Sequence, residues 1–444
     1  MGKKEERELL EAFEEYGADP EVLAEWELAV QKVKAVRGVL KLRTSAGYRM
    51  LKKVNVSHAR LRFIHEAIDH VANNGFKNVP RFIRTKYGDP YVVHPTGLYY
   101  LTDWFSGKEA DLKKPKNLFL AAESLARFHN AGTGYDGGGF GQETREDFSA
   151  TWSKYRVKLD SYSDHLAEKS EPSAMDELFA EYRGELAKMI DHSSEQLGKS
   201  PYGAVLEWAR DHKSICHGSF SRQNLVVDKE RMQVVDFDHC HFGHPIHDLG
   251  ALLARYMPRN KWDAEIGFSI IDVYRGVREL TTEEMTVLAA YLSFPQRTLQ
   301  LVESYFESTR DWKPEKFAER FKKSLALDRG RETFVQELID RYDLKMAAPS
   351  FASGLEGIES YDTYEEMESS SVENRDDGWQ EVEASMTSPV DVQEQEVTLV
   401  RFDEDNEPAS PKPRNRPKVK RPAQQQQLER KGLNPKPGLW TPRK

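Results

Sequence analysis

The sequence contains little cysteine and no long apolar run. Cys216 and Cys240 are the only cysteines among 444 residues, which excludes a disulfide framework and is typical of a protein that folds in a reducing compartment. No stretch of about 18 apolar residues occurs, so we predict no membrane-spanning helix. Net charge is also small in the body of the chain, because residues 1–355 carry −3 of the total of −9. We therefore expect neither nucleic acid nor a membrane surface as a partner.

Most of the net charge lies near the C-terminus. Residues 356–407 hold 18 acidic residues against two arginines, a net of −16, and residues 410–444 hold 11 basic residues against one glutamate, a net of +10. Eight of the 21 prolines fall in the last 37 residues. A segment this polar and proline-rich buries too little apolar area to offset its ordering entropy. We predict a low-complexity, disordered tail over residues 346–444.

Hydrophobic spacing divides the rest of the chain into three parts. Helical spacing over residues 5–34, interrupted where Asp19 can cap a helix and Pro20 can begin one, predicts an N-terminal helical arm over residues 1–30. Residues 31–105 are β-rich, with strands predicted at 36–43, 48–54, 82–84, 91–93 and 98–104 and a helix at 57–73. Residues 106–345 are mainly helical, which makes the fold class α+β.

The clearest chemical pattern interrupts the helical part. The loop 217–224 begins His-Gly-Ser and ends in Asn224, and Asp236 follows an apolar strand. An amide oxygen and a carboxylate on adjacent loops are hard ligands, suited to magnesium on a nucleoside triphosphate. Asp248 follows at the start of a predicted helix, where we interpret it as a structural cap that also steadies the loop.

These motifs resemble, in order and spacing, the catalytic and metal loops of the aminoglycoside-phosphotransferase-like, protein-kinase-like superfamily. Three further motifs are similar to those of the CotS family of bacterial spore coat proteins: Gly47-Tyr48-x-x-Leu51-Lys52, Gly75-Phe76-x-x-Val79-Pro80 and Leu292-Ser293-Phe294-Pro295. The resemblance covers about residues 25–342. It implies a two-lobed kinase-like fold, with a small β-rich N-lobe and a helical C-lobe, and ATP and Mg²⁺ as candidate cofactors. It also implies synthesis in the cytoplasm, deposition in the spore coat and other spore coat proteins as partners.

The resemblance assigns roles to single residues. Lys52 matches the lysine that holds the nucleotide phosphates, and Glu66, in the following helix, matches its partner. Asn224 and Asp236 match the metal ligands. At His217 we favour a structural histidine bonded to the backbone over a catalytic base.

Three departures from the family pattern bear on activity. Active members have an aspartate as the base where this chain has Ser219, and a serine hydroxyl is not a base near pH 7. The loop 43–48, interpreted as the nucleotide loop, has a single glycine. Asp238 adds a like charge two residues after Asp236, where it is a candidate either for binding metal or for a misplaced acid. We therefore predict a coat-assembly protein that binds nucleotide and transfers phosphate weakly or not at all. The alternative is an active ATP-dependent phosphotransferase acting on a small-molecule or protein hydroxyl.

Histidines suggest a rival metal site. Four of the 13 histidines lie within residues 239–247, together with Cys240. Imidazole and thiolate groups bind zinc, but this spacing fits no standard paired-ligand pattern. We favour a packed loop for this segment, and we interpret Cys216 as a small buried apolar residue.

Overall fold

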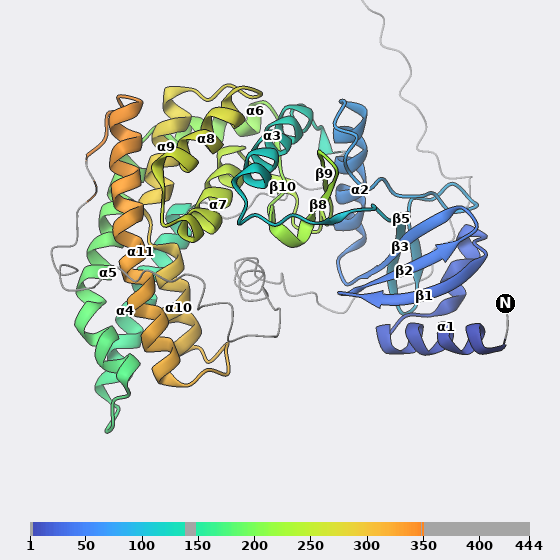
Figure 1. Ribbon diagram of the computed structural model, residues 1–444, viewed down its shortest axis with the longest axis horizontal. Coiled ribbons are helices and arrows are strands. Elements are labelled where there is room, and N and C mark those ends of the chain that lie inside the picture. Colours follow the sequence, from blue (N-terminus) through green and yellow to red (C-terminus); the bar gives the residue numbers. More distant parts are fainter. Residues whose placement is uncertain (1–2, 138–147, 348, 350–444) are drawn as a thin grey trace, which may run out of the picture. The chain divides into compact units, whose positions relative to one another are not determined.

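The computed structural model describes residues 3–137, 148–347 and 349. A five-stranded antiparallel sheet with flanking helices forms the N-terminal lobe, and a mainly helical C-terminal lobe follows (Figure 1). The predicted α+β, two-lobed architecture is confirmed. The tail predicted over residues 346–444 lies outside the described residues, except for residues 346, 347 and 349.

The N-terminal lobe starts with two helices and continues into the sheet. Its elements are α1 (Lys3–Tyr16), the 3-10 helix η1 (Pro20–Trp26), β1 (Val30–Val36), β2 (Val39–Thr44), β3 (Gly47–Val54), α2 (His58–Asn73), β4 (Val92–His94) and β5 (Gly97–Asp103). Asp19 caps η1, because its carboxylate accepts from the Glu21 N–H at 2.9 Å. Pro20 then begins the helix, as predicted.

Two secondary-structure predictions for this lobe are wrong. Residues 30–36 form the edge strand β1 and not the end of a helix. The three-residue spacing of Val30, Val33 and Val36 imitates a helix, but pairing with β2 through a register shift near Val30 makes the segment a strand. Residues 82–84 do not form a strand, since Phe82 makes only an isolated bridge to Thr102.

The two faces of the sheet pack against different helices, α1 and α2 (Figure 1). Leu51 and Tyr99 pack with Phe13 of α1 in one buried cluster. Val54 and Tyr100 belong to the larger core that includes α2. Side chains alternate along a strand, so the side chain of Lys52, next to Leu51, lies on the α2 face.

The C-terminal lobe holds most of the helices and five short strands. Its long helices are α3 (Pro115–Ala131), α4 (Phe148–Ala167), α5 (Ala174–Lys199), α6 (Tyr202–Asp211), α7 (Ile246–Tyr256), α8 (Ala264–Arg275), α9 (Thr282–Ser293), α10 (Gln296–Phe306) and α11 (Pro314–Arg341). The strands and 3-10 helices are β6 (Lys108–Glu109), β7 (Ile215–Cys216), η3 (Arg222–Asn224), β8 (Leu225–Asp228), β9 (Arg231–Val234), β10 (His241–Phe242) and η4 (Met257–Asn260). Strands β6, β8 and β9 form one sheet and β7 pairs with β10. These two small sheets carry the loops of the candidate site.

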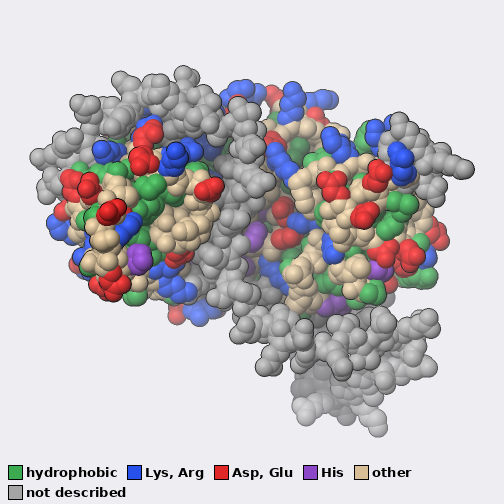
Figure 2. All heavy atoms as spheres, turned by 90° about the horizontal axis from the view of Figure 1, so that it is seen from below, with side chains coloured by type: hydrophobic (Ala, Val, Ile, Leu, Met, Phe, Trp, Pro, Cys, Tyr) green, Lys and Arg blue, Asp and Glu red, His purple; other side chains and the backbone are tan. Residues whose placement is uncertain are grey.

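The helices and the visible surface bear on whether a membrane or nucleic acid is a partner. Within residues 3–137 and 148–347, no helix has both the length and the apolar character needed to cross a membrane. On the face shown in Figure 2, the coloured Lys and Arg side chains are interspersed with Asp and Glu. Such mixing on this face differs from the clustered basic patch typical of a nucleic-acid interface.

Candidate nucleotide and metal site

The loop 217–224 follows β7 and is pressed against the segment after β9. Gly218 has φ +76°, and a Cβ atom there would lie 2.2 Å from the carbonyl oxygen of His239. Only glycine combines this backbone conformation with so close an approach. Steric constraints therefore explain why the second residue of the His-Gly-Ser motif is glycine.

Asp248 anchors this loop from below. Its carboxylate accepts the backbone N–H groups of His217 at 2.6 Å and Gly218 at 3.0 Å. It also lies 3.1 Å from His129 Nε2, while His129 Nδ1 is 2.7 Å from the hydroxyl of Tyr274. Burial by itself raises the pKa of Asp248, but the hydrogen bond from His129 and the nearby histidines hold it well below its usual range. Asp248 is therefore a carboxylate that steadies the loop.

One detail of the Asp248 prediction is wrong. Helix α7 begins at Ile246 after Pro245, so Asp248 lies inside the first turn and is not the N-cap. Its carboxylate binds backbone groups of another segment, not of its own helix. The sequence pattern indicates a helix start but carries no sign of this long-range contact.

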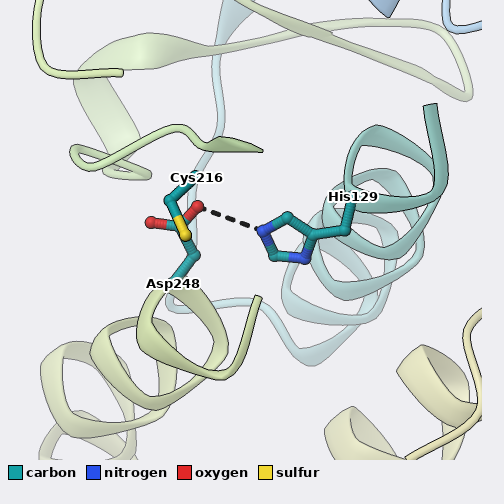
Figure 3. A group of neighbouring side chains, drawn as sticks. All are labelled: His129, Cys216 and Asp248. Carbon is teal, nitrogen blue, oxygen red and sulfur yellow. Dashed lines mark hydrogen bonds and ion pairs between the residues drawn. The ribbon is translucent and has the colours of Figure 1, made fainter. Parts of the chain in front are cut away.

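His129, Cys216 and Asp248 are the one group of potential metal ligands found close together among the described residues (Figure 3). Their ligand atoms lie within 4.8 Å of one another, and all three side chains are buried. Both nitrogens of His129 have partners, as above, and Cys216 Sγ donates to the carbonyl oxygen of His244 at 3.1 Å. The group is thus a hydrogen-bonded anchor. In the part of the chain that the structure describes, the histidines of residues 239–247 do not gather with Cys240 as a group of metal ligands, and His244 lies 3.0 Å from Glu284.

His217, Ser219 and Asn224 form a closed hydrogen-bonded unit above the anchor. His217 Nδ1 accepts the N–H of Ser219 at 3.2 Å, so its Nε2 carries the proton and donates to the carbonyl oxygen of Val235 at 3.2 Å. Burial lowers the pKa of His217, which keeps the ring neutral. The Asn224 amide donates to the carbonyl oxygen of Ser219 at 2.9 Å and to its hydroxyl at 3.3 Å. These contacts give His217 a backbone-bonding geometry.

Asn224 and Asp236 lie at adjacent ends of the β8–β9 hairpin. Leu225 pairs with Val234, and the N–H of Val235 donates to the carbonyl oxygen of Asn224 at 2.9 Å. Asp236 then turns away from the strand with φ +64°. The hairpin thus brings together the two residues that the sequence motif pairs.

Lys52 joins the segment 235–240, which follows β9, to the N-terminal lobe. Its Nζ lies 2.8 Å from a carboxylate oxygen of Asp236 and 2.8 Å from one of Asp238. Burial pulls the pKa of Lys52 down, but Tyr100 and the two carboxylates outweigh this and raise it well above its usual value. Burial and the neighbouring Asp236 raise the pKa of Asp238. One lysine thus holds two carboxylates across the lobes.

Glu66 is not brought to Lys52, contrary to the sequence prediction. Its carboxylate pairs with Arg62 at 3.1 Å, one helical turn earlier. Helix α2 contacts the segment after β9 through Arg60 instead. The Arg60 guanidinium donates to the carbonyl oxygens of Asp238 and Cys240, both at 2.6 Å. No sequence motif identifies Arg60, because its partners are backbone groups far along the chain.

The loop 43–48, interpreted from the sequence as the nucleotide loop, contains the turn between β2 and β3. Lys52 lies on β3, the second strand of this hairpin and the third strand of the sheet. The turn between the first two strands consists of Arg37 and Gly38, both with positive φ (44° and 60°). Arg37 forms an ion pair with Glu109 of β6 in the other lobe. The first hairpin therefore has a tight two-residue turn in place of a long glycine-rich loop.

Lys41 is a further feature of this face of the sheet that the sequence did not indicate. It pairs in register with Met50, two residues before Lys52, and so shares the α2 face of the sheet. Its Nζ lies 4.2 Å from the ring centre of Trp104 and 4.6 Å from that of Tyr48. The Lys41 ammonium group therefore makes cation–π contacts with both rings at this end of the sheet face.

The residues present fit a magnesium ion. Asp238 Oδ1 is buried and has no hydrogen-bond partner among the described residues. Together with Asn224 and Asp236, at adjacent ends of one hairpin, Asp238 offers oxygen ligands, which Mg²⁺ prefers. An added divalent cation would neutralise the carboxylate that Lys52 alone leaves in excess. The sequence left Asp238 open as a metal ligand or a misplaced acid, and the structure places its carboxylate beside Lys52 together with that of Asp236.

Known proteins resemble this chain in sequence and in fold. Residues 39–280 match the family model described as "Phosphotransferase enzyme family". The chain is 22% identical over 325 residues to spore coat protein S of Bacillus subtilis (strain 168), covering 71% of this chain and 90% of that protein. The aminoglycoside phosphotransferase from Alicyclobacillus acidocaldarius has a similar fold, with a TM-score of 0.67 and 22% identity, over 73% of this chain and 96% of that one. A spectinomycin phosphotransferase, solved with ADP and spectinomycin, gives a TM-score of 0.52 and 14% identity over 70% and 96% of the two chains. Because the family model spans more than half of the sequence, the chain belongs to the phosphotransferase enzyme family.

Proposed function

We propose that the protein is a spore coat protein that uses a kinase-like domain to bind ATP with Mg²⁺ in coat assembly, and that it transfers phosphate weakly or not at all. Similarity to spore coat protein S supports the coat location, the coat partners and a path from the cytoplasm to the coat. The observation that carries the proposal is that the site combines assembled binding residues with a missing base. Lys52, Asp236 and Asp238 are assembled, whereas the base position holds Ser219.

The argument for nucleotide binding depends on the charged side chains of this site. Asn224, Asp236 and Asp238 would hold the ion, and the ion would neutralise charge on the phosphate oxygens. Lys52 is the cation placed to donate to those oxygens. Because Lys52 is engaged with two carboxylates, we expect nucleotide to bind well only together with the divalent cation that replaces the lysine there.

Weak transfer rests on Ser219. Its side chain is 1% exposed and its hydroxyl accepts from the amide of Asn224 at 3.3 Å. A positioned base contributes about 10² to 10⁴-fold to such a reaction, and a neutral hydroxyl cannot supply it. Positioning and charge neutralisation remain, since they carry most of phosphoryl transfer.

The alternative, an active phosphotransferase on a small-molecule or protein hydroxyl, is favoured by Asp238. This carboxyl belongs to the segment whose next residue, His239, packs against Gly218. Burial raises its pKa toward the range useful for proton transfer. Under the alternative, Asp238 acts as the base in place of the missing aspartate. The wild-type protein then transfers phosphate, and the Asp238→Asn variant does not.

A thermal-shift titration tests binding. We expect MgATP to raise the melting temperature of the full chain, since a ligand at 100 times its Kd stabilises by about 2.7 kcal/mol. ATP with EDTA and Mg²⁺ without nucleotide serve as controls, and both should give smaller shifts. An unchanged melting temperature with MgATP contradicts the proposal.

A transfer assay then tests the role of Ser219. We expect Ser219→Asp to raise ATP-dependent phosphate transfer by at least about tenfold over wild type, while Ser219→Asn, which is similar in size but not a base, does not. Wild-type transfer at an ordinary kinase rate, about 1–100 s⁻¹, would favour the alternative. Detection of the protein in coat extracts of purified spores tests the location separately.

A further inference from the structure

Four cations share one face of the N-terminal sheet. Leu40, Leu42 and Leu51 pack on the α1 face, and side chains alternate along a strand. The opposite face, which also carries Lys52, holds the basic residues of β1 and β2: Lys32, Lys34, Lys41 and Arg43. Neither β1 nor β2 contains an acidic residue. We call these four residues the basic sheet face.

The cations of the basic sheet face lie directly opposite one another. In the register of β1 and β2, Lys32 pairs with Arg43 and Lys34 pairs with Lys41. Like charges in this position destabilise a sheet. Lysine on an edge strand such as β1 hinders pairing with other chains, but Lys41 and Arg43 lie on the inner strand β2. Protection of the edge therefore does not explain the two opposed pairs.

The described residues supply no carboxylate to offset this repulsion. Lys32, Lys34 and Arg43 are exposed, and within residues 3–137 and 148–347 no acidic side chain lies at ion-pair distance from any of the four cations. Lys41 lies over two aromatic rings, which carry no counter-charge. The basic sheet face therefore keeps a charge of +4 in this part of the chain.

A nucleotide held at Lys52 does not neutralise this face. Lys41 is level with Met50 and Arg43 with Tyr48, and these precede Lys52 on β3 by two and four residues. Arg43 thus lies about 13 Å from Lys52 along the strand direction. This exceeds the distance of about 8 Å over which charges interact at physiological salt. The basic sheet face therefore calls for a separate and more extended anion.

The chain itself carries such an anion after α11 in the sequence. Residues 356–388 contain 11 acidic residues against Arg375, a net charge of −10. Residues 356–407, at −16, also exceed the +10 of residues 410–444, so the basic end of the chain leaves acidic charge uncompensated.

The length of the chain allows residues 356–388 to reach this face. Ala347 is 9 residues before Glu356 and 41 before Ser388, which correspond to at most about 30 Å and 140 Å of extended chain. A body of about 345 residues has a radius of gyration of only about 20 Å. The acidic segment is therefore long enough to contact the sheet of its own chain.

We propose that the acidic segment 356–388 docks on the basic sheet face of the same chain. The backbone of the four cations is already ordered in the sheet, so the ordering cost of docking falls mainly on the segment. The contact is electrostatic and weakens as salt is added. It does not depend on nucleotide binding, because none of the four cations belongs to the Lys52 cluster.

Carbodiimide crosslinking of the full chain tests the proposal, because this reagent joins a lysine amine directly to a carboxylate in contact with it. Peptide mass spectrometry then identifies the linked residues. At low salt we expect Lys32 and Lys34 to be joined to residues 356–388 at least about fivefold more often than the exposed Lys77. At about 0.5 M NaCl, where charges are screened within about 5 Å, these links should fall at least about fivefold.

A double variant on β2 tests the role of charge in this contact. Lys41→Gln with Arg43→Gln removes half of the charge of the basic sheet face and leaves the two β1 lysines as reporters. We expect at least about fivefold fewer links from these lysines. The matched control is Lys77→Gln with Arg231→Gln, which removes one exposed lysine and one exposed arginine elsewhere and should change the links less than twofold. The salt series uses the unmodified chain and so tests the proposal even where the β2 variant disturbs the fold.

A mixture of isotope-labelled and unlabelled chains separates contacts within one chain from contacts between chains. Links confined to one chain support the proposal. Links mainly between chains would make a second copy the occupant and overturn it. So would links from the β1 lysines no more frequent than those from Lys77, or equal losses in the two double variants. Since no readout uses nucleotide, such a failure would not bear on the proposed function.

Discussion

Two carboxylate clusters flank the loop 217–224, and they differ in how completely the chain satisfies their hydrogen-bonding groups. Asp248 accepts from two backbone N–H groups and lies against His129, so its oxygens are all engaged by fixed donors. Asp236 and Asp238 share Lys52, and one oxygen of Asp238 is buried without a partner among the described residues. Buried polar groups that serve only the fold are normally satisfied. The first cluster therefore holds the loop, and the second is open to a ligand.

The pKa directions follow the same difference. Hydrogen bonds keep the pKa of Asp248 below its usual range despite burial, so its charge is stabilised by the fold. Burial and the charge of Asp236 raise the pKa of Asp238, so its ionised form lacks sufficient compensation. A cation arriving at the second cluster relieves this cost, whereas a cation at the first would have to break existing bonds.

The largest expected effect is on the anchor. Asp248→Ala should lower the free energy of unfolding by about 3 kcal/mol or more, since it leaves the N–H groups of His217 and Gly218 and a ring nitrogen of His129 buried without their acceptor. Urea unfolding measures the change, with the exposed Asp228→Ala as control. A loss below about 1 kcal/mol would show that the anchor does not hold the loop.

A pH series sharpens this result. Asp248 has a folded pKa below its unfolded value of about 3.9. Its contribution is therefore fully present above the unfolded pKa and is lost as the pH falls through the folded pKa. We expect the stability difference between wild type and Asp248→Asn to stay constant from about pH 8 to pH 5 and to shrink below about pH 4. A difference that disappears near pH 6 would instead implicate a histidine.

Lys52→Met probes the second cluster and should cost less, about 1–2 kcal/mol. The carboxylate of Asp236 stays 33% exposed, so water can compensate part of the lost ion pair. The distinguishing result is magnesium dependence. Without the lysine, Mg²⁺ alone should raise the melting temperature more than it does in wild type.

The matched control for this variant is Lys53→Met. Lys53 is adjacent on β3 but belongs to the other sheet face, where its ammonium donates to the carbonyl oxygen of Gly17 at 2.6 Å. It should gain no magnesium response. Equal responses in both variants would contradict a metal site at Asp236 and Asp238.

Asp236→Ala should change stability by less than about 1 kcal/mol, because removing one of two neighbouring carboxylates also relieves repulsion. It should nevertheless abolish magnesium-dependent nucleotide binding. Calorimetry with MgATP measures the second effect and unfolding the first. Unaltered MgATP binding would remove Asp236 from the metal site.

Features that depend on residues close together in the chain could be predicted from the sequence, whereas long-range contacts could not. Asn224 and Asp236 could be paired in advance because they lie at the two ends of one short hairpin, and the Asp19 cap before Pro20 follows a local rule. Arg60 could not be found, since it binds carbonyl oxygens about 180 residues away. Strand β1 was missed for a related reason, as its valine spacing resembles a helix until β2 pairs with it. Tertiary partners decide such segments.

Glu66 provides the smallest expected effect and the clearest test of a role inferred from family resemblance. Its carboxylate is 29% exposed and pairs with an Arg62 that is 51% exposed, and such surface pairs contribute about 0–1 kcal/mol. Glu66→Gln should therefore change the free energy of unfolding by less than about 0.5 kcal/mol and leave the affinity for MgATP within twofold. If nucleotide pulled Lys52 onto Glu66 in the bound state, the same variant would weaken MgATP binding at least tenfold while unliganded stability stayed unchanged. Measuring both quantities on one variant decides whether Lys52 stays paired with Asp236 and Asp238 or pairs with Glu66 of α2 when nucleotide binds.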